Sequence, residues 1–158
     1  MARVYVREAT PEDVDQLARL VARLKELNEE LDPHFKTVDN LEEQARKYVE
    51  EAVAADNRKV IVAADEETGE AVGLVILELQ DRVFYEPRIK AVITDFYVLP
   101  RYRRRRVGTL LLEKAEEAAR EAGAGIITAV YPAGNSIAAS FYKGRGFREL
   151  QVEVYKPL

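Results

Sequence analysis

Residues 89–131 constrain the fold most, because they read as a strand, a long amphipathic helix and a second strand. Residues 89–99 and 126–131 are apolar, partly β-branched runs, which is typical of strands. Between them, apolar residues recur at helical spacing from position 107 to 122, and Gly123 ends that helix. Two strands joined in this way pair in parallel, and the crossover is right-handed in nearly every known case. The segment therefore predicts a sheet that contains a parallel pair.

The segments on either side predict further strands and helices. Residues 3–7 alternate basic with apolar or aromatic side chains, as a half-buried strand does. Residues 10–13 supply a cap, a proline and early acids, which together indicate the start of a helix. The turn residues Thr68 and Gly69 indicate a hairpin. The remaining elements are helices over 14–31, 41–52 and 136–145, hairpin strands over 60–64 and 71–80, and a last strand over 147–155.

The predicted order of elements is β-α-α-β-β-β-α-β-α-β. Consecutive hairpins place antiparallel strands in one sheet, and the helices cover it. We therefore expect an α/β fold of the α+β kind, with a mixed, largely antiparallel central sheet flanked by helices. The chain has 158 residues, of which 47% are hydrophobic, so it suits one domain with a core and is too short for two of ordinary size. A single domain over residues 1–158 is expected.

Composition excludes several kinds of site. The chain has no cysteine, which excludes disulfides, a thiolate nucleophile and cysteine-ligated zinc. Its one histidine excludes a histidine-rich site, so no metal is expected. No apolar stretch approaches the roughly 20 residues of a membrane-spanning helix, and no leader pattern opens the sequence. We therefore expect a cytoplasmic protein without a membrane partner.

The arginines at 101–106, interrupted only by Tyr102, stand directly before the helix that begins at Val107. A helix N-terminus carries partial positive charge, so cations there lower helix stability unless an anion lies among them. The pattern therefore favours a multiply charged phosphate ligand. Nucleic-acid binding is the weaker alternative. The net charge is −4, and the basic residues stay within one loop without interleaved aromatics, apart from Tyr102.

Three motifs in this order and spacing resemble the GNAT family of N-acetyltransferases, over nearly the whole chain. Residues 94–98 lead to Pro100 as the family's central strand does. Residues 103–109 stand where the family has an Arg/Gln-x-x-Gly-x-Gly/Ala loop. Asn135 is followed by Phe141, Tyr142 and Lys143, and the motif closes with Gly146 and Phe147.

The resemblance implies acetyl transfer from acetyl-coenzyme A to an amine acceptor. In the family, backbone N–H groups of the loop bind the coenzyme's pyrophosphate, and the pantetheine arm enters between two splayed strands like an added strand. One N–H of the central strand stabilises the oxyanion. The residues implied in coenzyme binding are Phe96, Tyr97 and Val98 on the strand, Arg103, Arg104, Arg105, Arg106, Val107, Gly108 and Thr109 in the loop, and Asn135 beside the pantetheine.

The same resemblance implies two catalytic residues. Tyr142 stands at the position of the general acid that protonates the departing thiolate. A thiol pKa lies about 1.5 units below that of tyrosine, so this transfer is uphill by roughly 2 kcal/mol in free solution. The site must assist it, or the thiolate leaves first and is protonated later. Asp95 is the nearest acidic candidate to deprotonate the amine, directly or through a water, unless strand alternation turns it away from the cleft.

The sequence departs from the family pattern in two places. Arg106 replaces the first small residue of the loop, so either its side chain grips a phosphate or the loop is narrowed and coenzyme binding is weaker. A narrowed loop is the feature that motivates an alternative function, in which the protein binds the coenzyme but does not catalyse acetyl transfer. After the final helix only about one strand fits, where many relatives have two. The acceptor groove is then open, which suits a peptide terminus or completion by a second subunit in a homodimer.

Overall fold

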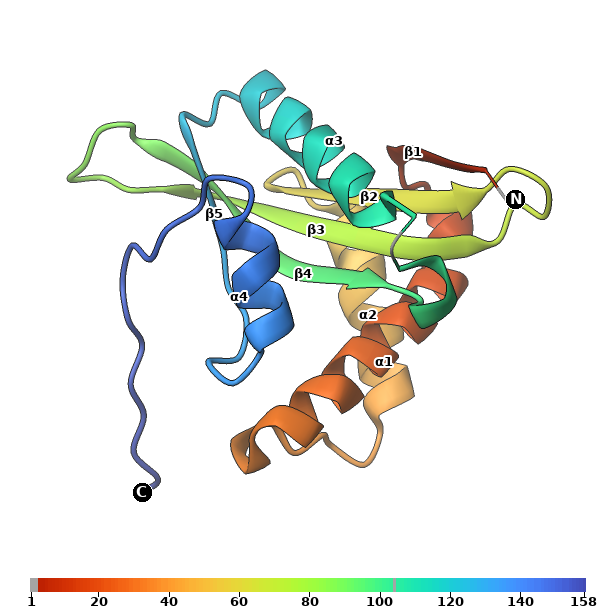
Figure 1. The fold of residues 1–158 in the computed structure, drawn as a ribbon, viewed down its shortest axis with the longest axis horizontal. Coiled ribbons are helices and arrows are strands. Elements are labelled where there is room, and N and C mark those ends of the chain that lie inside the picture. The colour runs from red at the N-terminus through yellow and green to blue at the C-terminus, as the bar shows by residue number, and fades with distance from the viewer. Residues whose placement is uncertain (1–2, 104) are drawn as a thin grey trace.

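The computed structural model describes residues 3–103 and 105–158, and its centre is a five-stranded sheet (Figure 1). The strands follow one another in space as they do in sequence, in the order β1-β2-β3-β4-β5. The elements are β1 Val4–Glu8, α1 Val14–Leu31, α2 Leu41–Ala54, β2 Arg58–Asp65, β3 Ala71–Asp81, β4 Ile89–Val98, α3 Val107–Glu121, β5 Ile126–Ala129 and α4 Ser136–Lys143, with 3-10 turns at Pro11–Asp13, Pro33–Phe35 and Pro100–Tyr102. The predicted fold class is confirmed.

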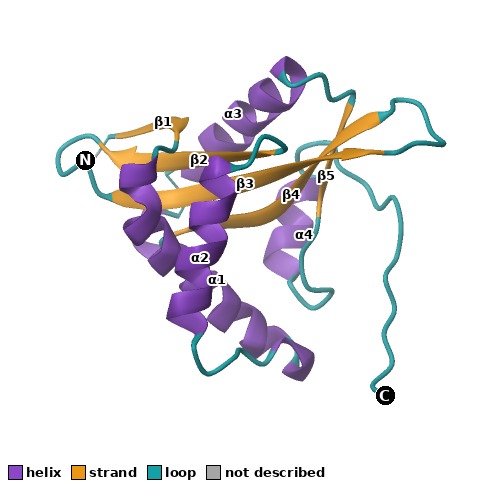
Figure 2. Cartoon of the chain, turned by 180° about the vertical axis from the view of Figure 1, so that it is seen from behind, coloured by secondary structure: helices purple, strands orange, loops and turns teal. Residues whose placement is uncertain are grey.

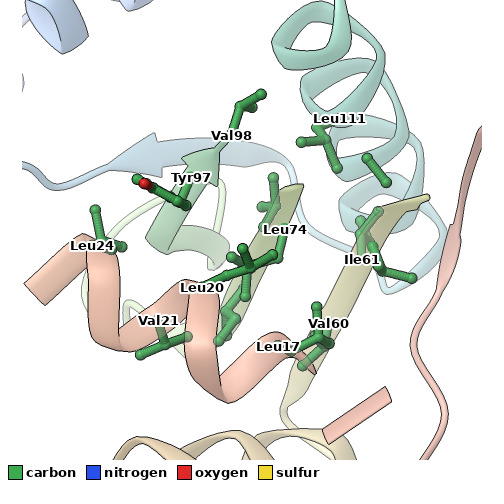
Figure 3. Close-up of a cluster of buried hydrophobic side chains, with 14 of the residues drawn as sticks. Leu17, Leu20, Val21, Leu24, Val60, Ile61, Leu74, Tyr97, Val98 and Leu111 are labelled. Atoms are coloured by element: carbon green, nitrogen blue, oxygen red, sulfur yellow. The ribbon is translucent and has the colours of Figure 1, made fainter. Parts of the chain in front are cut away.

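Helices cover both faces of the sheet. Figures 1 and 2 show α3 and α4 on one face and α1 and α2 on the other. Alternate residues of the central strands point to opposite faces, because successive side chains of a strand do so. In Figure 3, Val60 lies near Leu17 of α1, whereas Ile61 points toward Leu111 of α3. The core is therefore built in two layers, one on each side of the sheet.

The sheet is antiparallel from β1 to β4 and parallel between β4 and β5. The parallel register runs from the pair Lys90 and Ile126 to the pair Ile93 and Ala129. This pairing confirms the crossover that the strand, helix and strand pattern predicts. No helix among residues 3–103 and 105–158 is long and apolar enough to cross a membrane.

A β-bulge interrupts β4 at Thr94. Opposite it on β3, Ile76 pairs with Asp95 and Leu77 pairs with Ile93, which leaves Thr94 as the extra residue. A bulge bends its strand and increases the local twist. The ladder with β5 also ends at Ile93, one residue before the bulge. The bulge therefore marks the point at which β4 turns away from β5.

The strand predicted over residues 147–155 is wrong. These residues form no strand and instead run as a tail away from the sheet (Figure 1). Apolar residues do alternate here, at Leu150, Val152 and Val154, but all three are exposed. Alternation shows that a segment can pair with a sheet, but a strand also needs a neighbour. The described part of this chain supplies none for the tail.

Candidate active site where the fourth and fifth strands part

Arg106, which stands where the family pattern has a small residue, has a left-handed backbone at the start of α3. Arg106 is the helix N-cap, and its φ of 62° lies in the left-handed region. That region favours glycine, because a Cβ atom there crowds the following carbonyl. The first-turn N–H groups of Val107, Gly108 and Thr109 have no acceptor within a helix and point out of its end. The loop therefore keeps a backbone suited to an anion.

Gly108 is needed for close packing between three elements. A Cβ atom on Gly108 would lie 3.2 Å from the Phe141 ring of α4 and 3.7 Å from the Phe96 ring of β4. The first distance is tighter than ordinary van der Waals contact. Gly108 thus lets the start of α3 approach both aromatic rings, which a larger residue would push away.

Two arginines of the run stack on Tyr102. The Arg101 and Arg105 guanidinium groups lie 5.2 and 5.5 Å from the centre of its ring. The Tyr102 hydroxyl is buried and donates a 2.7 Å hydrogen bond to Asp65. That hydrogen bond is the largest cause of the lowered pKa of the Asp65 carboxyl. This role of Tyr102 in holding Arg101 and Arg105 was not predicted.

Arg103 and Arg106 point in different directions. Arg103 donates from Nε to the carbonyl of Val98 at 3.0 Å, and its guanidinium lies over the Tyr97 ring. Its side chain therefore packs against the end of β4. Arg106 lines a surface cavity of about 360 Å³ together with Arg105, Arg3 and Glu66. Arg104 lies outside the described residues. The described arginines of the run therefore do not converge on one point, and Arg106, the nearest to the helix start, lines a cavity at the β1 edge.

Arg145 is a cation at this site that sequence reasoning missed. Its Nη2 donates a 2.8 Å hydrogen bond to Thr109 Oγ1 in the first turn of α3. Its guanidinium lies 3.8 Å from the centre of the Phe141 ring and also donates to the Phe141 carbonyl. Arg145 thus links α4 to the helix start where the sequence predicts a phosphate. The only sequence signal was its place between Tyr142 and Gly146.

Beyond Ile93, β4 leaves an open edge on the side of β5. Their pairing covers only four positions, from Lys90 to Ile93, although β4 continues to Val98. The last bond joins the Val130 N–H to the Ile93 carbonyl at 3.1 Å. Phe96, Tyr97 and Val98 therefore lie where the two strands have separated, as the family resemblance implies. An extended ligand can pair with an edge of this kind.

Tyr142 lies at this separation within a group of aromatic rings. It stacks on Tyr131 with ring centres 5.6 Å apart, and it makes edge contacts with Phe96, Phe141 and Phe147. Burial, followed by the influence of Tyr131, raises the pKa of Tyr142 well above its ordinary value. The hydroxyl therefore stays protonated at neutral pH, and within the described residues it donates to no partner. Asn135 caps α4, accepting from the Ala138 N–H at 3.0 Å.

Asp95 is buried on the opposite face of the sheet, beneath α1 and α2. Its Oδ1 accepts a 2.7 Å hydrogen bond from Lys25 Nζ. Its Oδ2 accepts from the Tyr48 hydroxyl and from Thr94 Oγ1, the latter at 2.8 Å. Burial and the neighbouring Asp95 charge raise the pKa of Tyr48, so Tyr48 also stays protonated. Both carboxylate oxygens are thus engaged, and the bulge at Thr94 completes the cluster.

A family model described as "Acetyltransferase (GNAT) family" matches residues 22–147. No curated protein matches the sequence. Among solved structures, a tetramutant of the BH1408 protein from Bacillus halodurans is similar with a TM-score of 0.85 and 21% identity, over 98% of this chain and 99% of that one.

Two aminoglycoside N-acetyltransferases have the same fold. AAC(6')-Iy, in complex with CoA, matches with a TM-score of 0.78 and 16% identity, over 100% of this chain and 96% of its own. AAC(6')-IG from Acinetobacter haemolyticus, in its apo form, matches with a TM-score of 0.77 and 17% identity, over 98% and 97%. At these identities the likeness concerns the fold.

Proposed function

We propose, because this chain belongs to the GNAT acetyltransferase family, that it moves the acetyl group of acetyl-coenzyme A to a primary amine. The family makes the chain an acyltransferase, and the donor and acceptor are the proposal. One observation carries it: β4 and β5 part after Ile93, directly beside the start of α3 and the Tyr142 hydroxyl. An extended thioester with a phosphate at one end fits that combination of an open strand edge and a helix N-terminus.

The start of α3 would hold the pyrophosphate. The N–H groups of Val107, Gly108 and Thr109 supply donors, and the helix dipole favours negative charge there. Arg145, which already contacts Thr109, adds a guanidinium that can bind phosphate through two N–H groups. The Arg106 side chain would have to turn from its present cavity to do the same. Main-chain donors and Arg145 therefore carry most of this binding.

The open edge of β4 would hold the pantetheine arm. Phe96 to Val98 lie where β5 no longer pairs, so their main-chain groups on that side can bind an extended ligand. The acyl carbonyl then lies near the strand end, where an N–H stabilises the oxyanion that forms during attack. Asn135 would contribute by fixing the start of α4 rather than through its side-chain oxygen, which already caps that helix.

In the reaction, the amine nitrogen forms a bond to the acyl carbon and the carbon–sulfur bond breaks. Tyr142 would donate its hydroxyl hydrogen to the departing sulfur. Its raised pKa makes complete proton transfer to a thiolate more uphill than in water, where the gap is already about 1.5 units. A hydrogen bond to the developing thiolate avoids that cost and is strengthened by the negative charge. Tyr142 thus stabilises the leaving group, and protonation can follow from solvent.

Asp95 is better suited to positioning than to proton abstraction. Its two oxygens already accept hydrogen bonds from Lys25, Tyr48 and Thr94. A base needs a free lone pair within reach of the proton that it removes. We therefore assign Asp95 the role of holding Tyr48 and the bulged part of β4 in place. The acceptor amine would then lose its proton to water.

The decisive experiment measures free thiol release from acetyl-coenzyme A across a panel of peptide N-termini, lysine peptides, polyamines and aminoglycosides. Release above slow hydrolysis with at least one amine, together with the acetylated product by mass spectrometry, supports the proposal. Binding of acetyl-coenzyme A without turnover on any amine would favour the coenzyme-binding module. Binding of DNA or RNA without acetyl-coenzyme A binding would favour the nucleic-acid alternative.

A further inference from the structure

A cavity of about 360 Å³ lies between the edge strand β1 and the start of α3. Its lining comes from three segments that are far apart in the sequence. Arg3 and Val4 belong to the β1 side, Glu66 to the turn after β2, and Arg105, Arg106 and Leu110 to the arginine run and α3. This volume is at the lower end of the range for ligand pockets, so the cavity suits a small ligand.

Positive charge is concentrated in this cavity, although the whole chain has a net charge of −4. Three guanidinium groups and one carboxylate line it, which leaves an excess of two positive charges. Among the residues that the structure describes, Arg3, Arg105 and Arg106 have no carboxylate within ion-pair distance, whereas Arg101 of the same run pairs with Glu70 at 3.2 Å. Neighbouring charges of one sign repel, and an anion among them removes that cost.

Contacts within the protein hold the walls of the cavity in place. The Glu66 N–H donates to the Arg3 carbonyl at 2.9 Å, which joins the turn to β1. The Arg105 guanidinium lies 5.5 Å from the centre of the Tyr102 ring, and the Tyr102 hydroxyl donates to Asp65, the residue before Glu66. The charged groups are therefore positioned by the fold itself, which lowers the entropy that a ligand must lose on binding.

Arg106 lines the cavity from a backbone conformation that glycine adopts more readily. Its φ is 62°, and a residue with a Cβ atom is strained there. Residues in strained conformations of this kind cluster at sites that bind ligands. In this chain the strained position carries a guanidinium that faces the cavity, where it can meet an anion.

The cavity lies on the other side of α3 from the proposed pyrophosphate site. Leu110 lines the cavity, whereas Gly108 faces the Phe141 ring of α4. Residues two apart on a helix point about 200° away from each other, so these two residues mark nearly opposite sides of α3. Arg145, which contacts Thr109, also belongs to the α4 side. The positive charge of the cavity comes from side chains, so it does not depend on the N–H groups at the helix start.

We propose that this cavity is a second anion site, which binds a phosphate monoester. Such a group carries nearly two negative charges at neutral pH, which matches the excess of two positive charges in the cavity. A guanidinium can also bind phosphate through two parallel N–H groups. Two sources supply this chemistry. One is the ribose phosphate of coenzyme A, which is separate from its pyrophosphate, and this source rests on the proposed function. The other is a separate small phosphorylated molecule, which does not.

Calorimetry at low salt tests the first source, with acetyl-coenzyme A and its dephospho form, which lacks only the ribose phosphate. If the cavity binds that phosphate, the wild type prefers acetyl-coenzyme A by at least about tenfold, and the preference shrinks as salt is added. Arg3→Gln should reduce the preference to about threefold or less, because it removes one cation of the cavity. Glu66→Gln should increase it, because it removes the one carboxylate among the described lining residues. Arg19→Gln is the matched control, since it makes the same charge change at an exposed position of α1.

Ribose phosphate, added without coenzyme, tests the second source, and ribose is the control for the sugar. Binding of ribose phosphate but not of ribose, weakened by Arg3→Gln and strengthened by Glu66→Gln, supports a separate ligand. The melting temperatures of the variants without ligand should equal that of the wild type, since the Arg3 and Glu66 side chains make no ion pair within the described chain.

Two results would overturn the inference. In the first, the two coenzymes bind equally and ribose phosphate binds no better than ribose. In the second, a preference for phosphate persists unchanged in Arg3→Gln and Glu66→Gln, which means that the phosphate binds elsewhere. Either result leaves the proposed acetyl transfer standing, because thiol release measures it separately. If ribose phosphate binds through Arg3 but neither coenzyme binds at all, the second anion site stands and the proposed function fails.

Discussion

At the scale of single residues, substitutions of Arg106 distinguish the effect of its backbone conformation on stability from the effect of its side chain on coenzyme binding. Its left-handed φ of 62° costs a residue with a Cβ atom about 1 kcal/mol, and glycine avoids that cost. We predict that Arg106→Gly raises the free energy of unfolding by about 1 kcal/mol, measured by urea denaturation. Arg106→Ala is the matched control, because it removes the guanidinium but keeps the strained backbone.

The same pair of variants tests whether the Arg106 side chain grips phosphate. If it does, both variants bind acetyl-coenzyme A more weakly than the wild type, and the loss is larger at low salt than at high salt. Equal affinity in calorimetry at low salt would show that the main chain and Arg145 suffice. The gain in stability of the glycine variant over the alanine variant does not depend on that result.

The Tyr142 hydroxyl is predicted to matter for turnover and little for folding. Tyr142→Phe keeps the ring among Phe96, Phe141 and Phe147 but removes the hydrogen-bond donor. We expect kcat/KM for acetyl transfer to fall about 10²-fold or more, the usual size of a general-acid effect, with an unchanged melting temperature. Tyr131→Phe is the control, since it keeps the stacked ring and leaves the Tyr142 hydroxyl in place. Equal activity of the two variants would exclude Tyr142 as the donor to sulfur.

Sequence motifs predicted which residues form the candidate site but could not give the direction of their side chains. The GNAT pattern placed the loop, the end of β4 and Tyr142 near one another, and they are together in the fold. It could not show that Arg101 and Arg105 stack on Tyr102, or that Arg103 folds back over Tyr97. Each of these contacts depends on the competition between one guanidinium and several nearby acceptors and rings. Such competition is decided only by the folded surroundings.

At the scale of secondary structure, the periodicity of apolar residues predicted the helices and strands whose formation depends on local sequence. Each predicted helix, and each strand of the sheet, was found within a few residues of its expected bounds. The bulge at Thr94 was not predicted, because it depends on the register between β3 and β4. It lies at the candidate site, since Thr94 and Asp95 share one hydrogen-bonded cluster and the pairing with β5 ends at the residue before it. Residues 147–155 were predicted as a strand because apolar residues alternate there. Alternation does not show whether a strand of the sheet is available to pair with the segment.

The junction between β1 and α1 should be sensitive to acid. Asp13 accepts two hydrogen bonds from Arg7, at 2.7 and 2.9 Å, and the Arg7 bonds are the largest cause of its lowered pKa. A carboxyl with a depressed folded pKa adds stability above its unfolded pKa of about 3.9, and that stability is lost as the pH falls through the folded pKa. We predict that Asp13→Asn lowers the free energy of unfolding by about 1–2 kcal/mol at pH 7.

Urea denaturation at pH 7 and at about pH 3 checks this, because the two proteins should approach each other in stability as Asp13 becomes protonated. Asp15→Asn is the control, since Asp15 pairs with Arg46 at an exposed site and should change stability little. A difference between wild type and Asp13→Asn that stays constant with pH would mean that the carboxylate charge is not what stabilises the junction.

The Lys25 and Asp95 pair joins α1 to β4 and should couple helix packing to the site. Lys25→Met leaves the fully buried Asp95 carboxylate without its cation. We expect a loss of about 2 kcal/mol, less than for a wholly buried pair, because the Lys25 side chain keeps 38% exposure. Adding Asp95→Asn should recover part of the loss, since it removes the uncompensated charge. A double variant less stable than Lys25→Met by a further similar amount would mean that the two residues act independently.

At the scale of the whole molecule, the sheet separates two groups of residues, one on each of its faces. The face under α3 and α4 carries the helix start, Phe96 and Tyr142, whereas the face under α1 and α2 carries Asp95, Tyr48 and Lys25. The bulged end of β4 lies between them and takes part in both. The positioning role that we propose for Asp95 would therefore act through β4, without contact between the Asp95 cluster and the donor.

Acetyl-coenzyme A is predicted to stabilise the molecule as a whole, because its proposed site joins α3, β4 and α4. A ligand that binds only the folded state at a hundred times its Kd adds about 2.7 kcal/mol. For a domain of this length that corresponds to a rise in melting temperature of roughly 5–10 °C. Thermal unfolding with and without the ligand measures the rise, which should shrink at high salt because phosphates and guanidinium groups are screened. Arg145→Ala should reduce the shift, whereas Arg120→Ala on the exposed face of α3 should not. A shift produced by DNA and absent with acetyl-coenzyme A would mean that the arginine run, and not the parted strands, identifies the ligand.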